Sequence, residues 1–218
     1  MFKKIPTLLV AGAALLEAVG PALAQKGTEQ PKYEVIKLSD GVELRRYAPH
    51  LVAEITVVAG SMREASRTGF GPLARYIFGN NQGERKIAMT APVTTQEKTS
   101  GTEIAMTAPV TTSANENGAY TIRFSMPSKW TLDTLPIPND DEIQTNQVDT
   151  EIRVAYQFVG ARSQARINEA TAKIAAFLEA EKLEATSSII IAGYDGPSVP
   201  IRMKRWEVMQ ILERSEHP

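Results

Sequence analysis

Short runs of alternating hydrophobic and polar residues begin at Tyr33 and predict strands on both sides of a helical segment. Alternation with a period of two is typical of strands that turn one face to a core and the other to solvent. The motifs Ser39-Asp40-Gly41 and Ala48-Pro49-His50 predict turns between the first strands. The predicted strands of the first half are Tyr33–Leu38, Val42–Tyr47, Leu51–Val58, Ile87–Thr94 and Ile104–Thr111, with Tyr120–Met126 as an extra strand.

A helix is predicted after the third strand. Ser61 followed three residues later by Glu64 is a capping box, and apolar residues then recur at helical spacing as far as Phe78. Pro72 lies inside this pattern, with glycines on both sides of Phe70. Because proline removes a helical hydrogen bond, we expect a kink or two helical pieces here.

The second half of the chain repeats this order of elements. Strands are predicted at 142–148, 151–159, 187–194 and 205–212, and a helix from about 163 to 183. Equivalent elements lie about 100 residues apart: strand 51 with 151, helix 61 with 162, and strand 104 with 205. The pattern predicts an α+β fold of two pseudo-symmetric ββαββ halves, with two helices on an antiparallel sheet or distorted barrel. Two separate domains are the alternative, but no Gly/Ser/Pro linker divides the halves.

The first 24 residues are typical of a signal peptide. Lys3 and Lys4 precede a short apolar run, and Ala22-Leu23-Ala24 is a small-residue cleavage site. The apolar run is shorter than the roughly 20 residues that span a bilayer. We therefore expect an exported protein, periplasmic or extracellular, with no membrane span after cleavage. The predicted division is 1–24 signal peptide, 25–32 flexible lead, 33–212 single domain and 213–218 tail.

Charge and residue usage exclude several classes of function. The chain has 24 Lys plus Arg and 25 Asp plus Glu, with no basic run, so we do not expect a nucleic-acid partner. It has no cysteine, which excludes disulfides and thiolate chemistry. With His50 and His217 as the two histidines, most zinc sites and most Ser-His-Asp arrangements are also disfavoured.

One nine-residue segment, IAMTAPVTT, occurs at Ile87–Thr95 and again at Ile104–Thr112. Two interpretations remain open. The copies are the strands of a duplicated edge hairpin, or Met89 and Met106 present a soft apolar wall to a flat ligand.

Several motifs, in order along the chain, resemble the SOUL haem-binding proteins. They are ELRRYAPHLVAE from Glu43, GFGPLARYIFGNN from Gly69, IAMTAPV, FSMPSKWTLDTLPIPND from Phe124 and YDGPSVPIRMKRWEVM from Tyr194. The resemblance runs from about Tyr33 to Leu212. It implies a distorted barrel of two pseudo-symmetric halves, and haem or another porphyrin bound non-covalently in an apolar groove beside the first helix.

On this resemblance, the first helix supplies the site. Its floor would be Phe70, Leu73, Ala74 and Ile77, although at helical spacing the same stripe fits a plain core. The ring's propionates need a cation, for which Arg75 is the first candidate and Arg46 the second. A solvated face is the other interpretation for both arginines.

An iron ligand is less clearly indicated. Some relatives place a histidine where this chain has Arg46, and His50 follows four residues later in a predicted turn. His50 is either an axial ligand or a solvated turn histidine.

We therefore expect a tetrapyrrole carrier, buffer or scavenger and not an enzyme. Two alternatives remain: a hydrolase-like or haem-degrading enzyme on the same fold, and an interaction protein that has lost its ligand. The sequence does not define the oligomeric state.

Overall fold

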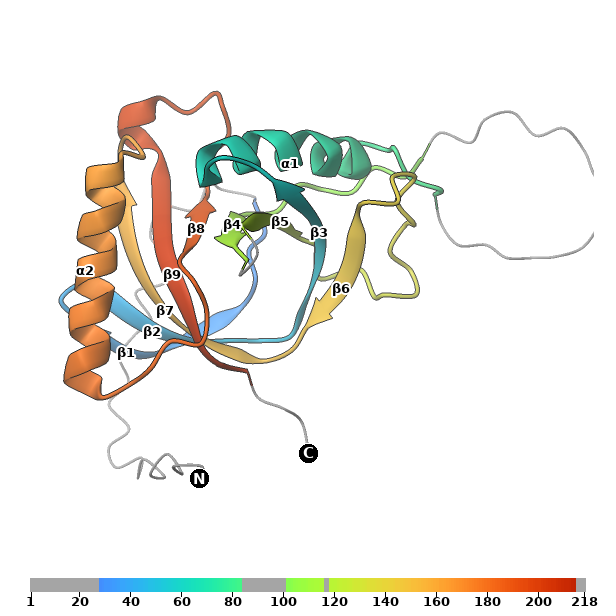
Figure 1. Cartoon of the computed structure of the whole chain (residues 1–218). Helices are drawn as coiled ribbons and strands as arrows, with labels where there is room; N and C mark the ends of the chain where they lie inside the picture. Colours follow the sequence, from blue (N-terminus) through green and yellow to red (C-terminus); the bar gives the residue numbers. More distant parts are fainter. Residues whose placement is uncertain (1–27, 84–100, 116–117, 215–218) are drawn as a thin grey trace, which may run out of the picture.

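The computed structural model describes residues 28–83, 101–115 and 118–214. These residues form nine strands and two α-helices, with α1 between β3 and β4 and α2 between β7 and β8 (Figure 1). A short 3-10 turn, η1, lies between β8 and β9. The strands are β1 Tyr33–Ser39, β2 Val42–Tyr47, β3 His50–Val58, β4 Val110–Ala114, β5 Ala119–Ser125, β6 Gln144–Val148, β7 Glu151–Val159, β8 Ile190–Gly193 and β9 Arg205–Arg214. The helices are α1 Met62–Ile77 and α2 Gln164–Glu181, and η1 is Ile201–Met203.

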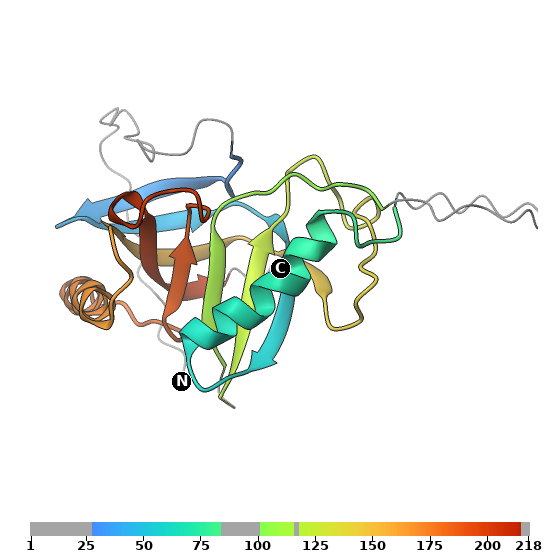
Figure 2. The same cartoon turned by 90° about the horizontal axis from the view of Figure 1, so that it is seen from above.

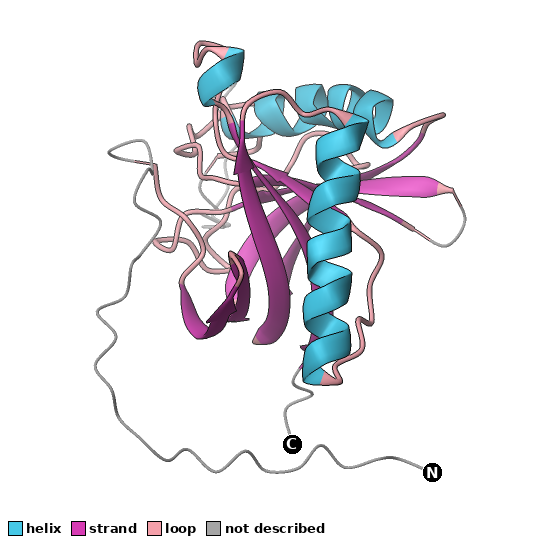
Figure 3. Cartoon of the chain, turned by 90° about the vertical axis from the view of Figure 1, so that its left-hand side faces the viewer, coloured by secondary structure: helices cyan, strands magenta, loops and turns pink. Residues whose placement is uncertain are grey.

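All nine strands join one antiparallel sheet in the order β1-β2-β7-β9-β8-β4-β5-β3-β6. The sheet curls into half a barrel (Figure 1). Helix α1 packs on β3, β4 and β5, while α2 packs on β2, β7 and β9. Each half of the sheet therefore has its own covering helix, as Figures 1 and 3 show. The predicted α+β fold with two helices is confirmed.

The two halves are related by a pseudo-twofold axis. The order β2-β3-α1-β4-β5 is repeated as β6-β7-α2-β8-β9, and exchanging the equivalent strands reverses the sheet order of these eight strands. Strand β1 is an addition at one edge. An offset of 101 residues relates the buried positions of the helices, from Leu73 to Ile174 and from Tyr76 to Phe177. The prediction that strand 104 corresponds to strand 205 is wrong, because the equivalent of β9 is β5.

Helix α1 begins as its capping pattern predicts. The Ser61 hydroxyl accepts a hydrogen bond from the Glu64 amide at 3.2 Å, and the Glu64 carboxylate accepts one from the Gly60 amide at 3.0 Å. The helix then continues through Pro72 to Ile77, so the prediction of two helical pieces is wrong. Leu73 and Tyr76 follow the proline and are fully buried, and this packing holds the helix together across the missing hydrogen bond.

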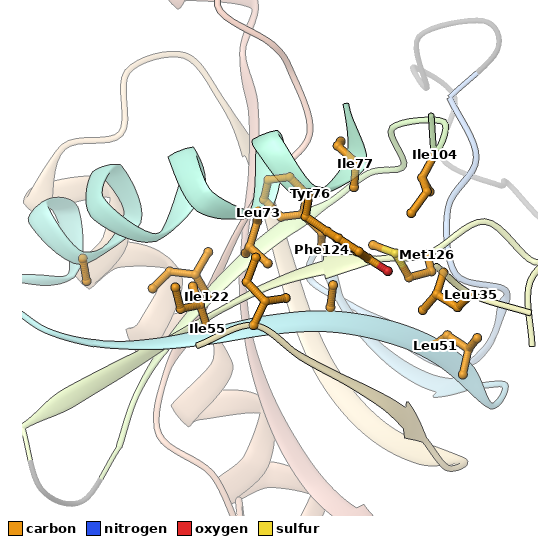
Figure 4. Packing of buried hydrophobic residues seen from close by; sticks show 13 residues of the cluster. Leu51, Ile55, Leu73, Tyr76, Ile77, Ile104, Ile122, Phe124, Met126 and Leu135 are labelled. Atoms are coloured by element: carbon orange, nitrogen blue, oxygen red, sulfur yellow. The ribbon is translucent and has the colours of Figure 1, made fainter. Parts of the chain in front are cut away.

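The core beneath α1 is formed by side chains from the helix and from strands β3 and β5. Figure 4 shows Leu73 pointing from the helix toward Ile55 and Ile122 of the sheet, while Tyr76 extends toward Met126. The Tyr76 hydroxyl donates a 2.7 Å hydrogen bond to the carbonyl of Pro136, which satisfies its polar end. A second cluster beneath α2 repeats the arrangement. In the described part of the chain, no helix is long and apolar enough to cross a membrane.

The segment before β4 differs from its prediction. A strand was expected over Ile104–Thr111, but residues 104–109 form a coil, and β4 begins at Val110. Pro109 has no amide hydrogen to give to a sheet, and the amide of Ala108 donates instead to the carbonyl of Glu29 at 2.9 Å. The predicted strand 87–94 lies outside the described residues, so the duplicated segment is seen in one copy.

The contact of α1 with β5 predicts opposite effects for two glycines of the helix. A Cβ atom at Gly69 would lie 2.8 Å from the side chain of Ile122, whereas one at Gly71 would meet only the Arg75 guanidinium at 3.7 Å. Gly69→Ala should lower the free energy of unfolding by about 1 to 3 kcal/mol, because the added methyl group would push α1 away from Ile122 of β5. Gly71→Ala should raise it by up to about 1 kcal/mol through helix propensity. Urea unfolding of both variants measures the difference, and equal effects would contradict the tight contact at Gly69.

Candidate functional site

The residues predicted on the first helix divide between its two faces. Leu73 and Ile77 point into the core and are fully buried. Phe70 and Arg75 are exposed, and Ala74 is half-buried. A ligand that lies against the helix from outside would therefore meet Phe70, Ala74 and Arg75, with Leu73 and Ile77 beneath them.

One flank of α1 faces strands β4 and β5. The hydroxyls of Ser66 and Thr112 on β4 lie 2.9 Å apart, and the ring centroids of Phe70 and Phe124 on β5 lie 5.3 Å apart. Ala74 is one turn beyond Phe70 on the same flank. The two residues thus form an apolar edge where the helix meets the sheet.

The coil 101–109, which carries Met106, runs between the end of α1 and strand β5. Its start is tied to the helix end by a 2.8 Å hydrogen bond from the Ile104 amide to the Ile77 carbonyl. Its end is tied to β5, because the Thr107 hydroxyl donates to the Ser125 carbonyl. Figure 2 shows this coil returning past α1 to the start of β4. Met106 is 40% exposed between the two ties. We call Phe70, Ala74, Arg75 and Met106 the α1 surface.

The two predicted anion-binding arginines lie in different parts of the molecule. Among the described residues, no carboxylate lies within ion-pair distance of Arg75, so its guanidinium is available to a ligand. Arg46 is on β2, in the half of the sheet covered by α2, and it forms an ion pair with Glu34 of β1. The structure therefore places Arg75 with the α1 surface and Arg46 apart from it. Met89 lies outside the described residues.

The pseudo-symmetry provides an internal comparison for the α1 surface. At the offset of 101 residues, Phe70 corresponds to Thr171 of α2, and Arg75 corresponds to Ala176. Helix α2 exposes no large hydrophobic side chain along Gln164–Glu181. Since both helices have the same structural role, the fold itself does not require the aromatic and basic residues of α1.

His50 lies at the start of β3 and not in a turn. Its Nδ1 is 2.9 Å from the carbonyl oxygen of Ala48. Because a carbonyl only accepts, Nδ1 carries the hydrogen, and the lone pair of the neutral ring is on Nε2. Burial lowers the pKa of His50 and favours this neutral form. An imidazole held by a backbone carbonyl in this way has the chemistry of a metal ligand.

His50 lines a cavity of about 320 Å³ beyond the end of the α1 core. This volume is at the lower end of the range for small-molecule pockets, about 300 to 1,000 Å³. Apolar and polar side chains line it in equal number, and the large apolar ones are Leu51, Met126, Trp130 and Leu132. Trp130 and Leu132 were not among the predicted site residues, because they fall between predicted elements. The available signal was that both lie in the motif FSMPSKWTLDTLPIPND, which carries part of the family resemblance.

A buried polar cluster lies on the other face of the sheet from α2. The Arg45 guanidinium donates to both carboxylate oxygens of Glu207, at 2.9 and 2.8 Å. The Tyr194 hydroxyl donates to Glu207 at 2.5 Å, and the Tyr47 hydroxyl accepts from Arg45 at 3.1 Å. Burial raises the pKa of Tyr47 and of Tyr194. Because each charge in this cluster is matched by another, we assign it a structural role.

Comparison with known proteins assigns the family. The family model described as SOUL heme-binding protein matches residues 28–101 and 95–211, so the chain belongs to the SOUL family. The resemblance noted from the motifs is thereby confirmed. A 53-residue segment is 43% identical to human Heme-binding protein 2, and this match spans 24% of the chain and 26% of the human protein.

Solved structures with the same fold share little sequence with this chain. The C-terminal domain of EcmrR aligns with a TM-score of 0.56 at 11% identity, over 84% of this chain and 99% of that domain. A hydrolase from Listeria innocua aligns with a TM-score of 0.52, also at 11% identity, over 80% of this chain and 93% of the hydrolase. At this identity the likeness concerns the fold alone.

The partly buried position of His50 predicts a contribution to stability that depends on pH. Its pKa is lower in the folded than in the unfolded chain, so the unfolded state takes up a proton first as pH falls. The free energy of unfolding should therefore be fully supported above about pH 6.5 and decline below it. Urea unfolding from pH 7.5 to 5 should show a smaller decline in His50→Gln. NMR titration of the ring should give a pKa below 6.5, and an unshifted value would contradict this account.

Proposed function

We propose that the protein binds haem or a related tetrapyrrole non-covalently on the α1 surface. The observation that carries this proposal is the exposed Arg75, which has no carboxylate partner among the described residues and directly follows the apolar edge of Phe70 and Ala74, in a member of the SOUL family. A porphyrin needs a flat apolar contact for its ring and a cation for its propionates. The α1 surface offers both within about one helical turn.

The affinity would come mainly from burial of the ring. The porphyrin face would cover Phe70, Ala74 and Met106, and apolar burial contributes roughly 25 cal/mol per Å² before the costs of association. Arg75 would hold a propionate through two parallel N–H···O hydrogen bonds, which also orients the ring. In this arrangement the iron needs no bond from the protein.

We propose a carrier, buffer or scavenger rather than an enzyme. Phe70, Ala74 and Met106 have no acid, base or nucleophile to offer a bound ligand, and the Arg75 guanidinium offers hydrogen-bond donors. Binding and release without bond rearrangement is the chemistry that these side chains support.

A carboxylate placed on the apolar edge should weaken haemin binding. In Ala74→Glu the new charge would lie against the ring and near the propionates, so binding should weaken by about 2 kcal/mol or more. Ala175→Glu makes the same change at the equivalent, exposed position of α2 and should leave the affinity unchanged. Titration of both variants, followed by Soret absorbance, measures the difference. Unchanged haemin affinity in folded Ala74→Glu would place the site elsewhere.

The iron should add little to the affinity. Iron-free protoporphyrin should bind within about tenfold of haemin, a difference of roughly 1.4 kcal/mol, and His50→Ala should alter neither affinity. The measurement is a pair of titrations, by Soret absorbance for haemin and by fluorescence for protoporphyrin. A hundredfold preference for haemin that disappears in His50→Ala would show instead that His50 Nε2 binds the iron.

A further inference from the structure

The arginines of this protein fall into two groups according to their partners. Of those whose side chains the structure describes, five form ion pairs with carboxylates: Arg45, Arg46, Arg123, Arg153 and Arg205. Arg166 donates to the backbone carbonyl of Val159. The remaining five have no carboxylate partner among the described residues. They are Arg63, Arg67, Arg75, Arg162 and Arg202, and we call them the arginine face.

The arginine face lies at one end of the molecule. Three of its members are on α1, Arg202 is in η1, and Arg162 is in the turn before α2. Figures 1 and 3 both place α1 and η1 along the same end. Burial, together with the charge of Arg63, lowers the pKa of Arg162.

Large apolar side chains are exposed at the same end. Ile201 and Met203 of η1 are 66% and 57% exposed, on either side of Arg202. Phe78, at the C-terminal end of α1, is 62% exposed. Such side chains are costly to leave in water, and here they lie among arginines that have no carboxylate partner in the described part of the chain.

On α1, neither feature is needed to build the fold. At the equivalent positions of α2, Arg63 is replaced by Gln164, Arg67 by Asn168 and Arg75 by Ala176. The aromatic Phe78 corresponds to Glu179. Helix α2 has two basic and three acidic residues, whereas α1 has three basic and one acidic. Two helices with the same role in the core thus present surfaces of opposite charge.

We propose that the arginine face docks on a membrane surface rich in anionic phospholipids. Its guanidinium groups would contact lipid phosphates, while Ile201, Met203 and Phe78 would enter the boundary between headgroups and acyl chains. The same guanidinium groups could also contact the phosphates of a nucleic acid. Surfaces that bind single strands, however, combine such charges with aromatic side chains that stack on the bases, and Ile201 and Met203 are not aromatic. The mixture of cations with Ile, Met and Phe therefore favours a lipid surface.

This proposal does not depend on tetrapyrrole binding. Arg75 belongs to both surfaces, but the bilayer contacts assigned to Arg63, Arg67 and Arg202 use side chains outside the α1 surface. It adds a place of action, since apolar porphyrins partition into bilayers and a protein docked there would meet them directly.

The test uses haem-free protein comprising residues 25–218, and vesicles of two compositions. Co-sedimentation with vesicles of phosphatidylglycerol and phosphatidylcholine at 3:7 should show binding that weakens as salt rises from 20 to 500 mM. Vesicles of pure phosphatidylcholine should bind at least about tenfold more weakly. Equal binding to both compositions, or none to either at 20 mM salt, would overturn the proposal.

Two triple variants separate position from net charge. Arg63→Gln, Arg67→Gln and Arg202→Gln together should lower the affinity for anionic vesicles by about a hundredfold, at about fivefold for each charge removed. The control combines Lys129→Gln, Lys173→Gln and Lys182→Gln, which removes the same charge elsewhere. The control should bind within about threefold of the parent protein. Equal losses in the two triples would show attraction by net charge alone and would overturn a defined docking face.

A third variant tests the apolar contact. Ile201→Ser with Met203→Ser should lower vesicle affinity about tenfold, with a loss that persists at 500 mM salt, because it is not electrostatic. A loss seen only at low salt would overturn membrane insertion by η1. Haemin titration of the same proteins in the absence of lipid reports on the α1 surface separately, so failure of one proposal is visible apart from the other.

Discussion

The ion pair between Arg45 and Glu207 is the interaction on which the curled sheet most depends. These residues lie on β2 and β9, the two strands that flank β7, and their side chains are 4% and 3% exposed. Arg45 also pairs in register with Arg153 of β7, so two like charges face each other on the inner side of the sheet. Glu207 neutralises the first and Glu151 the second. Removal of one partner would leave a buried charge unpaired, at a cost of about 3 to 5 kcal/mol. The two carboxylates are therefore needed to keep both arginines buried on the inner face of the sheet.

The two helices pack on the outer face of the curled sheet, and the two halves of the molecule differ in the surfaces of these helices. The same element order and the same 101-residue offset place α1 and α2 over equivalent strands. Their buried residues match in position, as Leu73 and Ile174 show, whereas their exposed residues do not. The core fixes which residues must be apolar and leaves the outer surface unconstrained. A difference between the exposed residues of two pseudo-symmetric helices is therefore stronger evidence of function than the exposure of a single residue.

The strand pattern was predictable wherever alternation was regular. Val42–Tyr47 and Glu151–Val159 have the predicted bounds, because one face of each packs under α2. Prediction failed where backbone groups found partners that the local sequence does not reveal. Ala108 donates to Glu29, far away in the chain, and so residues 104–109 do not extend the sheet. His50 was treated as a turn residue because Pro49 precedes it, yet it begins β3 and is held by the Ala48 carbonyl.

The sequence by itself determined the family, the α+β class and the two ββαββ halves, because motif order and hydrophobic period are local properties that survive without coordinates. It also named Arg75 and Phe70. Only the tertiary structure separated Leu73, which faces the core, from Ala74 beside it. It also separated Arg46, paired with Glu34, from Arg75, which pairs with no carboxylate in the ranges that the structure describes. The same holds for the arginine face, whose members come from 63 to 202 in the chain. Which charges are left without a partner depends on contacts between distant segments, and these exist only once the sheet has curled and both helices have packed.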